Sequence, residues 1–166
     1  MTQPTLRRAQ PLDVVNLYRL VLAQGEFSLL DSSDEARALV QVLELITEGY
    51  VLVAHNKANR LVASIAFAGD QTTSGTPICK GVWLAVNPSY RDSTVVADLL
   101  DLSTRAAASA GFPVCIPVAF SPDDKLERVV REAGFKRGSV YWIHRIKAKN
   151  GVRTDSSGAD QVQPKV

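Results

Sequence analysis

The sequence has few of the residues that mark specialised proteins. It contains two cysteines, Cys79 and Cys115, which form no C-x-x-C pair. This spacing argues against a zinc site and a disulfide framework, and it predicts a reducing compartment. No apolar run approaches the roughly 18 residues of a membrane-spanning helix, and the opening MTQPTLRRAQPLD lacks the apolar core of a signal peptide. We therefore expect a cytoplasmic protein with no metal site and no membrane partner.

The sequence also has no large excess of positive or negative charge. The formal net charge of the 166 residues is +2 at pH 7, so charge predicts no nucleic-acid partner. A hydrophobic content of 46% with 22% charged residues is typical of a folded globular chain. The length predicts one domain, which we place at residues 1–147. Residues 148–166 are polar and have no periodic apolar face, so we expect a flexible tail there.

Hydrophobic periodicity predicts two helices early in the chain. The first covers residues 13–24, with Asp13 as its N-cap. The second covers residues 32–49, where Ser32 and Glu35 form a capping box and Gly49 ends the helix. The face of this second helix that we expect to be buried consists of Ala36, Leu39, Val40, Leu43 and Ile46.

Strands and further helices follow. Residues 5–9 form a short strand, 50–56 and 60–69 form a hairpin, and 70–77 form a polar loop. A strand over 80–86 precedes a helix over 94–110, and a strand over 112–120 contains two prolines that indicate an edge or a bulge. A helix capped by Ser121 with Pro122 at its first position ends at Gly134, and 136–146 form the last strand. The order predicts a mixed sheet with helices on both faces.

Glycine is missing where a phosphate-binding loop would need it. Residues 87–100, NPSYRDSTVVADLL, connect a strand to the start of a helix, which is the usual construction of an anion site. Such loops are usually rich in glycine because backbone N–H groups must approach the phosphate closely. No glycine lies between Asn87 and Leu100.

The element order, with VNPSYR at 86–91 and REAGF at 131–135, resembles the GCN5-related N-acetyltransferase (GNAT) superfamily over roughly residues 5–146. The resemblance implies an α/β fold with a mixed, mostly antiparallel sheet, helices on both faces and splayed central strands. It implies acetyl-CoA as cofactor, with the pantetheine arm on the backbone of a bulged fourth strand and the pyrophosphate on the loop that follows. The implied arm-binding residues are Leu84, Ala85 and Val86, and the implied loop residues are Arg91, Asp92, Ser93, Thr94, Val95 and Val96.

The chain departs from the family pattern at several of these positions. Thr94 and Val96 replace the two loop glycines, and we expect the Val96 methyl groups to crowd the phosphate. Asp92 adds a negative charge beside the anion site. Val82 stands where many members have a glutamate as general base, and Val130 where many have a tyrosine as general acid. The catalytic residues therefore stay unknown at this point.

Two functions are open. One is an acyltransferase that moves an acetyl group from acetyl-CoA to an unidentified primary amine of a small molecule or a protein. The other is a catalytically inactive structural or interaction module, because the glycine-poor loop looks like those of GNAT-like proteins encoded by bacteriophages; such a module would be virion-associated. Either protein could form homo-oligomers. Asp70, in the polar loop, is a candidate for contact with the acceptor, whereas His55, His144 and Cys115 fit ordinary structural roles.

Overall fold

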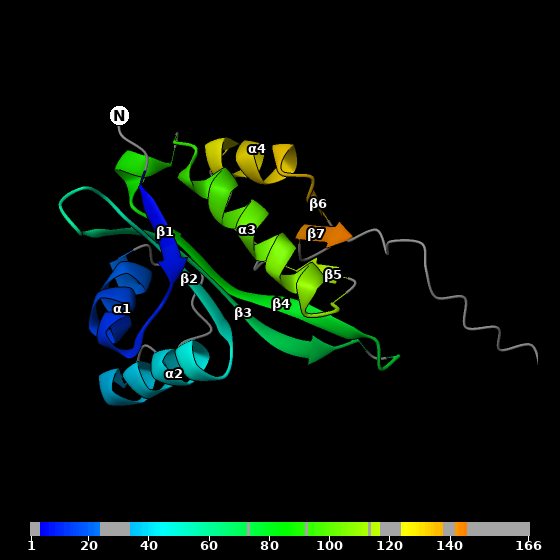
Figure 1. Ribbon diagram of the computed structural model, residues 1–166, viewed down its shortest axis with the longest axis horizontal. Coiled ribbons are helices and arrows are strands. Elements are labelled where there is room, and N and C mark those ends of the chain that lie inside the picture. The colour runs from blue at the N-terminus through cyan, green and yellow to red at the C-terminus, as the bar shows by residue number, and fades with distance from the viewer. Residues whose placement is uncertain are drawn as a thin grey trace, which may run out of the picture.

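The computed structural model describes residues 4–23, 34–72, 74–91, 93–112, 114–116, 124–137 and 142–145. Figure 1 shows one sheet with helices on both sides. The helices are α1 (Val14–Ala23), α2 (Glu35–Thr47), α3 (Val95–Ser109) and α4 (Asp124–Glu132), with short 3-10 helices η1 (Pro11–Asp13) and η2 (Pro88–Tyr90). The strands are β1 (Thr5–Arg8), β2 (Tyr50–His55), β3 (Leu61–Gln71), β4 (Pro77–Val86), β5 (Val114–Ile116), β6 (Lys136–Arg137) and β7 (Trp142–Arg145).

The described strands lie in the order β1-β2-β3-β4-β5-β7-β6. Strands β1 to β4 are antiparallel to their neighbours, which confirms the predicted hairpin of β2 and β3. Strands β4 and β5 run parallel, with Cys79 opposite Cys115. A parallel pair is expected where a helix, here α3, makes the crossover between two strands. The predicted splaying of these two strands involves residues 117–120, which lie outside the described residues.

Two hydrophobic cores lie on opposite faces of the sheet. Helices α1 and α2 cover one face, where Leu17 and Val42 are buried in one cluster with Trp83. Helices α3 and α4 cover the other face, where Leu99 and Val130 are buried with Leu84. The predicted mixed sheet with helices on both faces is therefore confirmed. No helix in the described part of the chain has the length and apolar character needed to cross a bilayer.

Helix α2 differs from its prediction in its start and its buried face. Its N-cap is Asp34, whose side chain accepts a hydrogen bond from the Arg37 backbone N–H, whereas Ser32 lies outside the described residues. The buried face contains Ala38, Val42 and Ile46, and Val40 and Leu43 are exposed. Apolar residues occur on almost every side of this helix, so their spacing alone does not select one face.

Three other segments also differ from their predictions. The polar loop is shorter than 70–77, because β3 continues to Gln71 and β4 begins at Pro77. The predicted last strand, 136–146, is a pair of antiparallel strands, with Lys136 opposite Ile143. Strand β5 pairs on both sides, so it is not an edge strand. The two prolines, Pro113 and Pro117, lie outside the described residues.

Helix ends follow their predictions more closely. Gly111 and Gly134 both have positive φ, at 82° and 89°, directly after α3 and α4. A left-handed residue is the usual way to end a helix, and glycine adopts it without steric cost. The predicted cap at Ser121 and Pro122, and the predicted tail at 148–166, lie outside the described residues.

Candidate functional site

Strand β4 contains a bulge, as the family resemblance implies. Ala66 pairs with Trp83 and Phe67 pairs with Gly81, so Val82 is an extra residue on β4. Val82 and Trp83 consequently both face the α1/α2 side of the sheet. The Trp83 indole N–H donates to Ser64 Oγ at 3.1 Å, and Ser64 Oγ donates to the Leu52 carbonyl at 2.9 Å. These buried bonds fix the strand beside the bulge.

At the end of β4, a ligand could contact backbone groups rather than side chains. Leu84, Ala85 and Val86, the implied arm-binding residues, are all buried. The chain then turns through η2, where the Asn87 backbone N–H donates to the Val62 carbonyl at 2.8 Å. The Ser93 hydroxyl donates to the Tyr90 carbonyl at 2.6 Å. The turn is therefore held by internal bonds and leads directly into α3.

The start of α3 corrects our expectation about Val96. The Val95 and Val96 side chains are both 0% exposed and belong to the core between α3 and the sheet. The methyl groups of Val96 therefore point away from any phosphate at the helix N-terminus. Thr94, the N-cap, is exposed and makes no side-chain capping bond. The N–H groups of the first helical turn have no intrahelical partner, so this end of α3 presents backbone donors. Asp92 lies outside the described residues.

The two positions implied for proton transfer are apolar and buried. Val82 lies at the bulge with 7% exposure, and Val130 in α4 is 0% exposed. Neither side chain can accept or donate a proton.

A cavity of about 390 Å³ lies between α2 and the sheet on the α1/α2 side. Its helical wall consists of Gln41, Glu44, Leu45 and Glu48. Its sheet wall consists of Gly49, Ala68, Gly69 and the bulge residue Val82. The volume falls within the range of about 300–1,000 Å³ that small-molecule sites occupy.

Sequence reasoning missed the two glutamates of this cavity. The signal was present, because no lysine or arginine occurs between Ala38 and Asn56, so Glu44 and Glu48 have no basic neighbour along the chain. Asp70, our candidate for acceptor contact, lies further along β3 and pairs with Lys80 at 3.5 Å.

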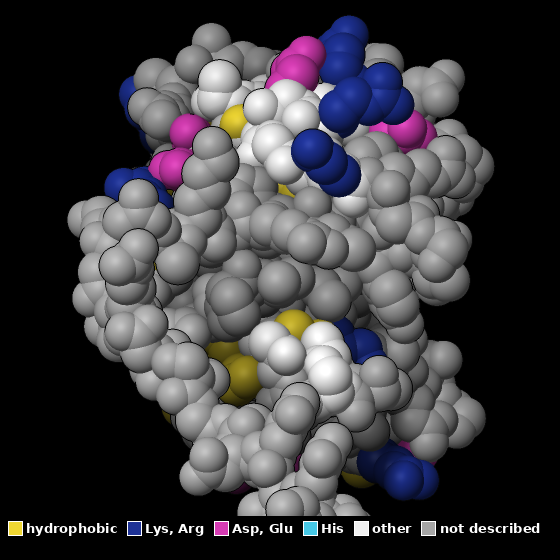
Figure 2. All heavy atoms as spheres, turned by 90° about the vertical axis from the view of Figure 1, so that its right-hand side faces the viewer, with side chains coloured by type: hydrophobic (Ala, Val, Ile, Leu, Met, Phe, Trp, Pro, Cys, Tyr) yellow, Lys and Arg dark blue, Asp and Glu magenta, His cyan; other side chains and the backbone are white. Residues whose placement is uncertain are grey.

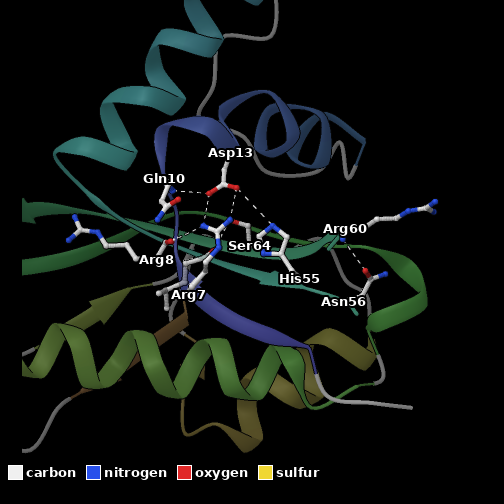
Figure 3. A network of polar contacts seen from close by, with 9 residues as sticks. Arg7, Arg8, Gln10, Asp13, His55, Asn56, Arg60 and Ser64 are labelled. Carbon is white, nitrogen blue, oxygen red and sulfur yellow. Dashed lines mark hydrogen bonds and ion pairs between the residues drawn. The ribbon is translucent and has the colours of Figure 1, made fainter. Parts of the chain in front are cut away.

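A second polar cluster joins β1, η1 and β2 (Figure 3). Arg7 Nη1 and Nη2 donate to the two carboxylate oxygens of Asp13 at 2.7 and 2.8 Å, and the Gln10 backbone N–H donates to Asp13 Oδ2 at 2.8 Å. His55 Nε2 lies 3.9 Å from Asp13 Oδ1. Asp13 is thus the centre of a buried network and not the N-cap of α1 that we predicted.

The charges in this cluster shift the pKa values of its members. The hydrogen bonds from Arg7 lower the pKa of Asp13, against the opposing effect of burial, and the bond to Asp13 raises the pKa of Arg7. Burial, together with the positive charge of Arg7, lowers the pKa of His55 although the Asp13 carboxylate opposes this. Because every member is tied to another, the cluster is a structural support of the β1–β2 edge.

Charged side chains are mixed elsewhere on the surface. At the α4 end of the face in Figure 2, lysine and arginine side chains lie beside aspartate and glutamate side chains. On α4, Arg131 pairs with Glu127 at 2.6 Å. No group of three or more His, Cys, Asp or Glu side chains that could hold a metal lies together in the described part of the chain.

The fold matches solved acetyltransferases, although no family model and no curated protein sequence matches the chain. A ribosomal-protein-S5-alanine acetyltransferase from Vibrio fischeri superposes with a TM-score of 0.68 at 9% identity, covering 89% of this chain and 96% of that chain. A GNAT-family N-acetyltransferase from Escherichia coli in complex with CoA has a TM-score of 0.64 at 19% identity, covering 87% and 82%. An aminoglycoside 6'-N-acetyltransferase from Acinetobacter baumannii has a TM-score of 0.62 at 17% identity, covering 81% and 91%. This chain therefore has the fold of the GNAT acetyltransferases.

Proposed function

We propose that the protein is an acyltransferase that moves an acetyl group from acetyl-CoA to a primary amine. The observation that carries the proposal is the N-terminus of α3, where Val96 turns into the core and Thr94 leaves the helix without a side-chain cap. Backbone N–H groups and the positive end of the helix dipole bind phosphate whatever side chains the turn carries. The loss of the loop glycines is therefore compatible with a pyrophosphate site.

The residues around this turn fit the cofactor. Arg91, directly after η2, supplies a positive charge for the pyrophosphate, and the first-turn N–H groups of Val95 and Val96 supply donors. Leu84, Ala85 and Val86 present backbone groups to the pantetheine arm, next to the bulge at Val82. Acetyl-CoA, when bound, supplies a thioester that is already activated toward amines. Ser93 keeps the turn in place through its bond to Tyr90.

The acceptor is an amine, by analogy with proteins of the same fold. The solved structures include an enzyme named for alanine of ribosomal protein S5, one named for aminoglycosides, and a complex bound to a peptide and CoA. In the transfer, the amine nitrogen would bond to the acetyl carbon, the carbon–sulfur bond would break, and the proton lost by the amine would pass through water to the departing CoA thiolate. Val82 and Val130 cannot take part in this proton transfer, which is worth roughly 10²–10⁴ in rate where a side chain performs it. Positioning of the two reactants then carries the acceleration.

A second candidate is a binding or structural module without catalysis. It is favoured by the same two buried valines, which remove both groups that the resemblance assigns to proton transfer. The likeness to bacteriophage-encoded proteins belongs to this alternative, and so does a virion location. Cofactor binding distinguishes the two candidates, since a module kept for its surface has no need of acetyl-CoA.

The experiment is calorimetry of the full-length protein with acetyl-CoA and with CoA. We expect binding that Arg91→Ala weakens by about tenfold or more at low salt, with a smaller loss at high salt because the contact is between charges. Arg105→Ala is the matched control, since Arg105 lies exposed near the other end of α3 and pairs with Asp101. Failure of the wild-type protein to bind either compound at millimolar concentration would refute the proposal and leave the non-catalytic module.

A further inference from the structure

Helix α2 has apolar surface on the side away from its buried face. Four exposed residues lie in one row along this side, at spacings of four, three and four: Ala36, Val40, Leu43 and Thr47. Val40 is 53% exposed and Leu43 is 40% exposed. The Thr47 hydroxyl donates to the Leu43 carbonyl at 3.1 Å, so this polar group is satisfied within the helix. We call these four residues the outer row of α2.

The exposed large hydrophobic side chains in the described part of the chain all lie on the same layer of the fold. Besides Val40 and Leu43, they are Leu12 in η1 and Val15 and Leu22 in α1, the helix that contacts α2 (Figure 1). A single exposed apolar side chain is ordinary on a protein surface. Several that gather on one side indicate a surface that binds another molecule.

The pattern of the outer row is typical of a helix that packs against another helix. Apolar residues at alternating intervals of three and four form the seam of a two-stranded coiled coil, and charged residues beside the seam select the partner. Two exposed charged residues lie on one flank of the row: Arg37 directly follows Ala36, and Glu44 directly follows Leu43. These two charges are seven residues apart, which is too far for them to pair within the helix.

The signs of these two charges are unfavourable within α2 itself. Arg37 lies in the first turn, where the helix dipole is positive, and Glu44 lies in the last turn, where it is negative. If a second α2 lies antiparallel to the first, each arginine is beside the negative end of the other helix. The charges that are unfavourable in one copy are then favourable between two copies.

We infer that two copies of this chain associate through the outer rows of α2, with the two helices antiparallel. A two-fold axis crosses each row between Val40 and Leu43, so that Val40 of one copy packs against Leu43 of the other. By the same symmetry Ala36 of one copy packs against Thr47 of the other. The occupant of the exposed face is therefore a second copy of the same face.

Charge complementarity is the reason for choosing a second copy, and it also selects the antiparallel orientation. In this orientation Arg37 lies across from the partner's Glu44, and the symmetry forms this pair twice. In a parallel pair the charged flanks would lie on opposite sides of the seam, and the pair would not form. Helix α2 has 13 residues and is about 20 Å long, so the interface is small and we expect a weak dimer. The inference does not depend on whether the protein binds acetyl-CoA.

The first test is sedimentation velocity of the full-length protein at concentrations up to millimolar, where we expect a monomer–dimer equilibrium. Val40→Lys/Leu43→Lys should raise the dissociation constant by about tenfold or more, because unpaired charges would be buried in the seam. Both positions are exposed, so the melting temperature of this variant should equal that of the wild type at concentrations where both are monomeric. The matched control is Ala108→Lys, at an exposed position of α3 on the other side of the sheet, which should leave the dimer unchanged.

Charge reversal tests the pairing across the seam. Arg37→Glu and Glu44→Arg each place like charges opposite one another twice, so each should weaken the dimer by about fivefold or more at low salt. The combined variant exchanges the signs of both pairs and should restore the affinity of the wild type. Arg105→Glu, at an exposed position of α3, should have no effect.

Cysteine crosslinking tests the orientation of the two helices. When Ala36→Cys and Thr47→Cys proteins are mixed with oxidised glutathione, we expect a disulfide between the two variants. Neither variant should crosslink alone, because equivalent positions lie about 16 Å apart along an antiparallel pair. The wild-type protein treated in the same way is the control for Cys79 and Cys115.

Several outcomes would overturn the inference. A wild-type protein that stays monomeric at millimolar concentration would show that a second copy does not cover the face. A dimer that Val40→Lys/Leu43→Lys leaves intact would place the interface elsewhere. Charge reversals without rescue by the combined variant, or crosslinks within either cysteine variant alone, would contradict the antiparallel arrangement.

Discussion

The partly buried ion pair between Arg7 and Asp13 allows a quantitative prediction. Asp13 is 3% exposed and accepts three hydrogen bonds, two of them from the Arg7 guanidinium (Figure 3). In Asp13→Asn, one oxygen remains to accept a bond, and the new NH2 group faces a donor of Arg7. A hydrogen bond to a charged group contributes about 1.5–3 kcal/mol, and Arg7, at 34% side-chain exposure, recovers part of its hydration. We therefore expect a loss of about 2–4 kcal/mol in the free energy of unfolding.

The matched control is Asp101→Asn. Asp101 also pairs with an arginine, Arg105, at 2.6 Å, but the two side chains are 62% and 70% exposed. Exposed pairs at i and i+4 contribute about 0.3–0.5 kcal/mol, so this variant should stay within about 0.5 kcal/mol of the wild type. Both variants would be measured by urea unfolding followed by tryptophan fluorescence, since Trp83 is buried in the core that α1 and α2 form with the sheet. Equal losses in the two variants would refute the argument that burial decides the contribution.

Three further predictions follow from other positions. Val96→Gly should cost about 2–4 kcal/mol of unfolding free energy, because it removes a buried side chain and adds a helical glycine. The same variant should not tighten acetyl-CoA binding, and a tighter affinity measured by calorimetry would contradict the buried position of Val96. Gly49→Ala should cost about 1–3 kcal/mol, since its Cβ would lie 2.8 Å from the Leu45 carbonyl oxygen and 2.9 Å from that of Phe67; an unchanged urea midpoint would show that this close approach relaxes freely. The free energy of unfolding should fall as pH falls, first below 6.5, the ordinary pKa of histidine, because of His55, and then below 3.8, the ordinary pKa of aspartate, because of Asp13. Both groups have lower pKa values in the folded protein, so the unfolded chain binds more protons. His55→Gln should remove the decrease near neutral pH, and urea unfolding at a series of pH values that showed a rise in stability on acidification would contradict the prediction.

The fold was predictable because its strands and helices differ clearly in period and end at recognisable residues. The turn at residues 57–59 contains Asn59, which has a φ of 55° and begins the return to β3. The stops at Gly111 and Gly134 were predictable for the same reason. Helix α2 was harder, because Leu39, Val40, Leu43 and Leu45 spread apolar surface around it and tertiary packing chose the face.

The candidate site was harder to predict from the sequence, because it depends on the direction in which side chains point rather than on which residues are present. Val96 was expected to crowd a phosphate, but its effect depends on which way the first turn of α3 faces, and this is set by packing of the helix against the sheet. The cavity depends on the distance between α2 and β3, which no pattern in the sequence encodes. The roles that we assign to Arg91 and to residues 84–86 stay predictions until the binding experiments are done.

The bulge in β4 also has a consequence for how this chain aligns with its structural neighbours. Gly81 lies on the α3 side of the sheet and Trp83 on the α1/α2 side, as two consecutive residues of an ordinary strand would. Removing Val82 would therefore leave every other residue of β4 on its present face. A single-residue insertion or deletion at this point exchanges a bulged strand for a regular one, and the other residues of the strand keep their faces of the sheet. Chains of this fold can consequently differ by one residue here, and an alignment that forbids the gap would pair every residue after it with the wrong face of the sheet.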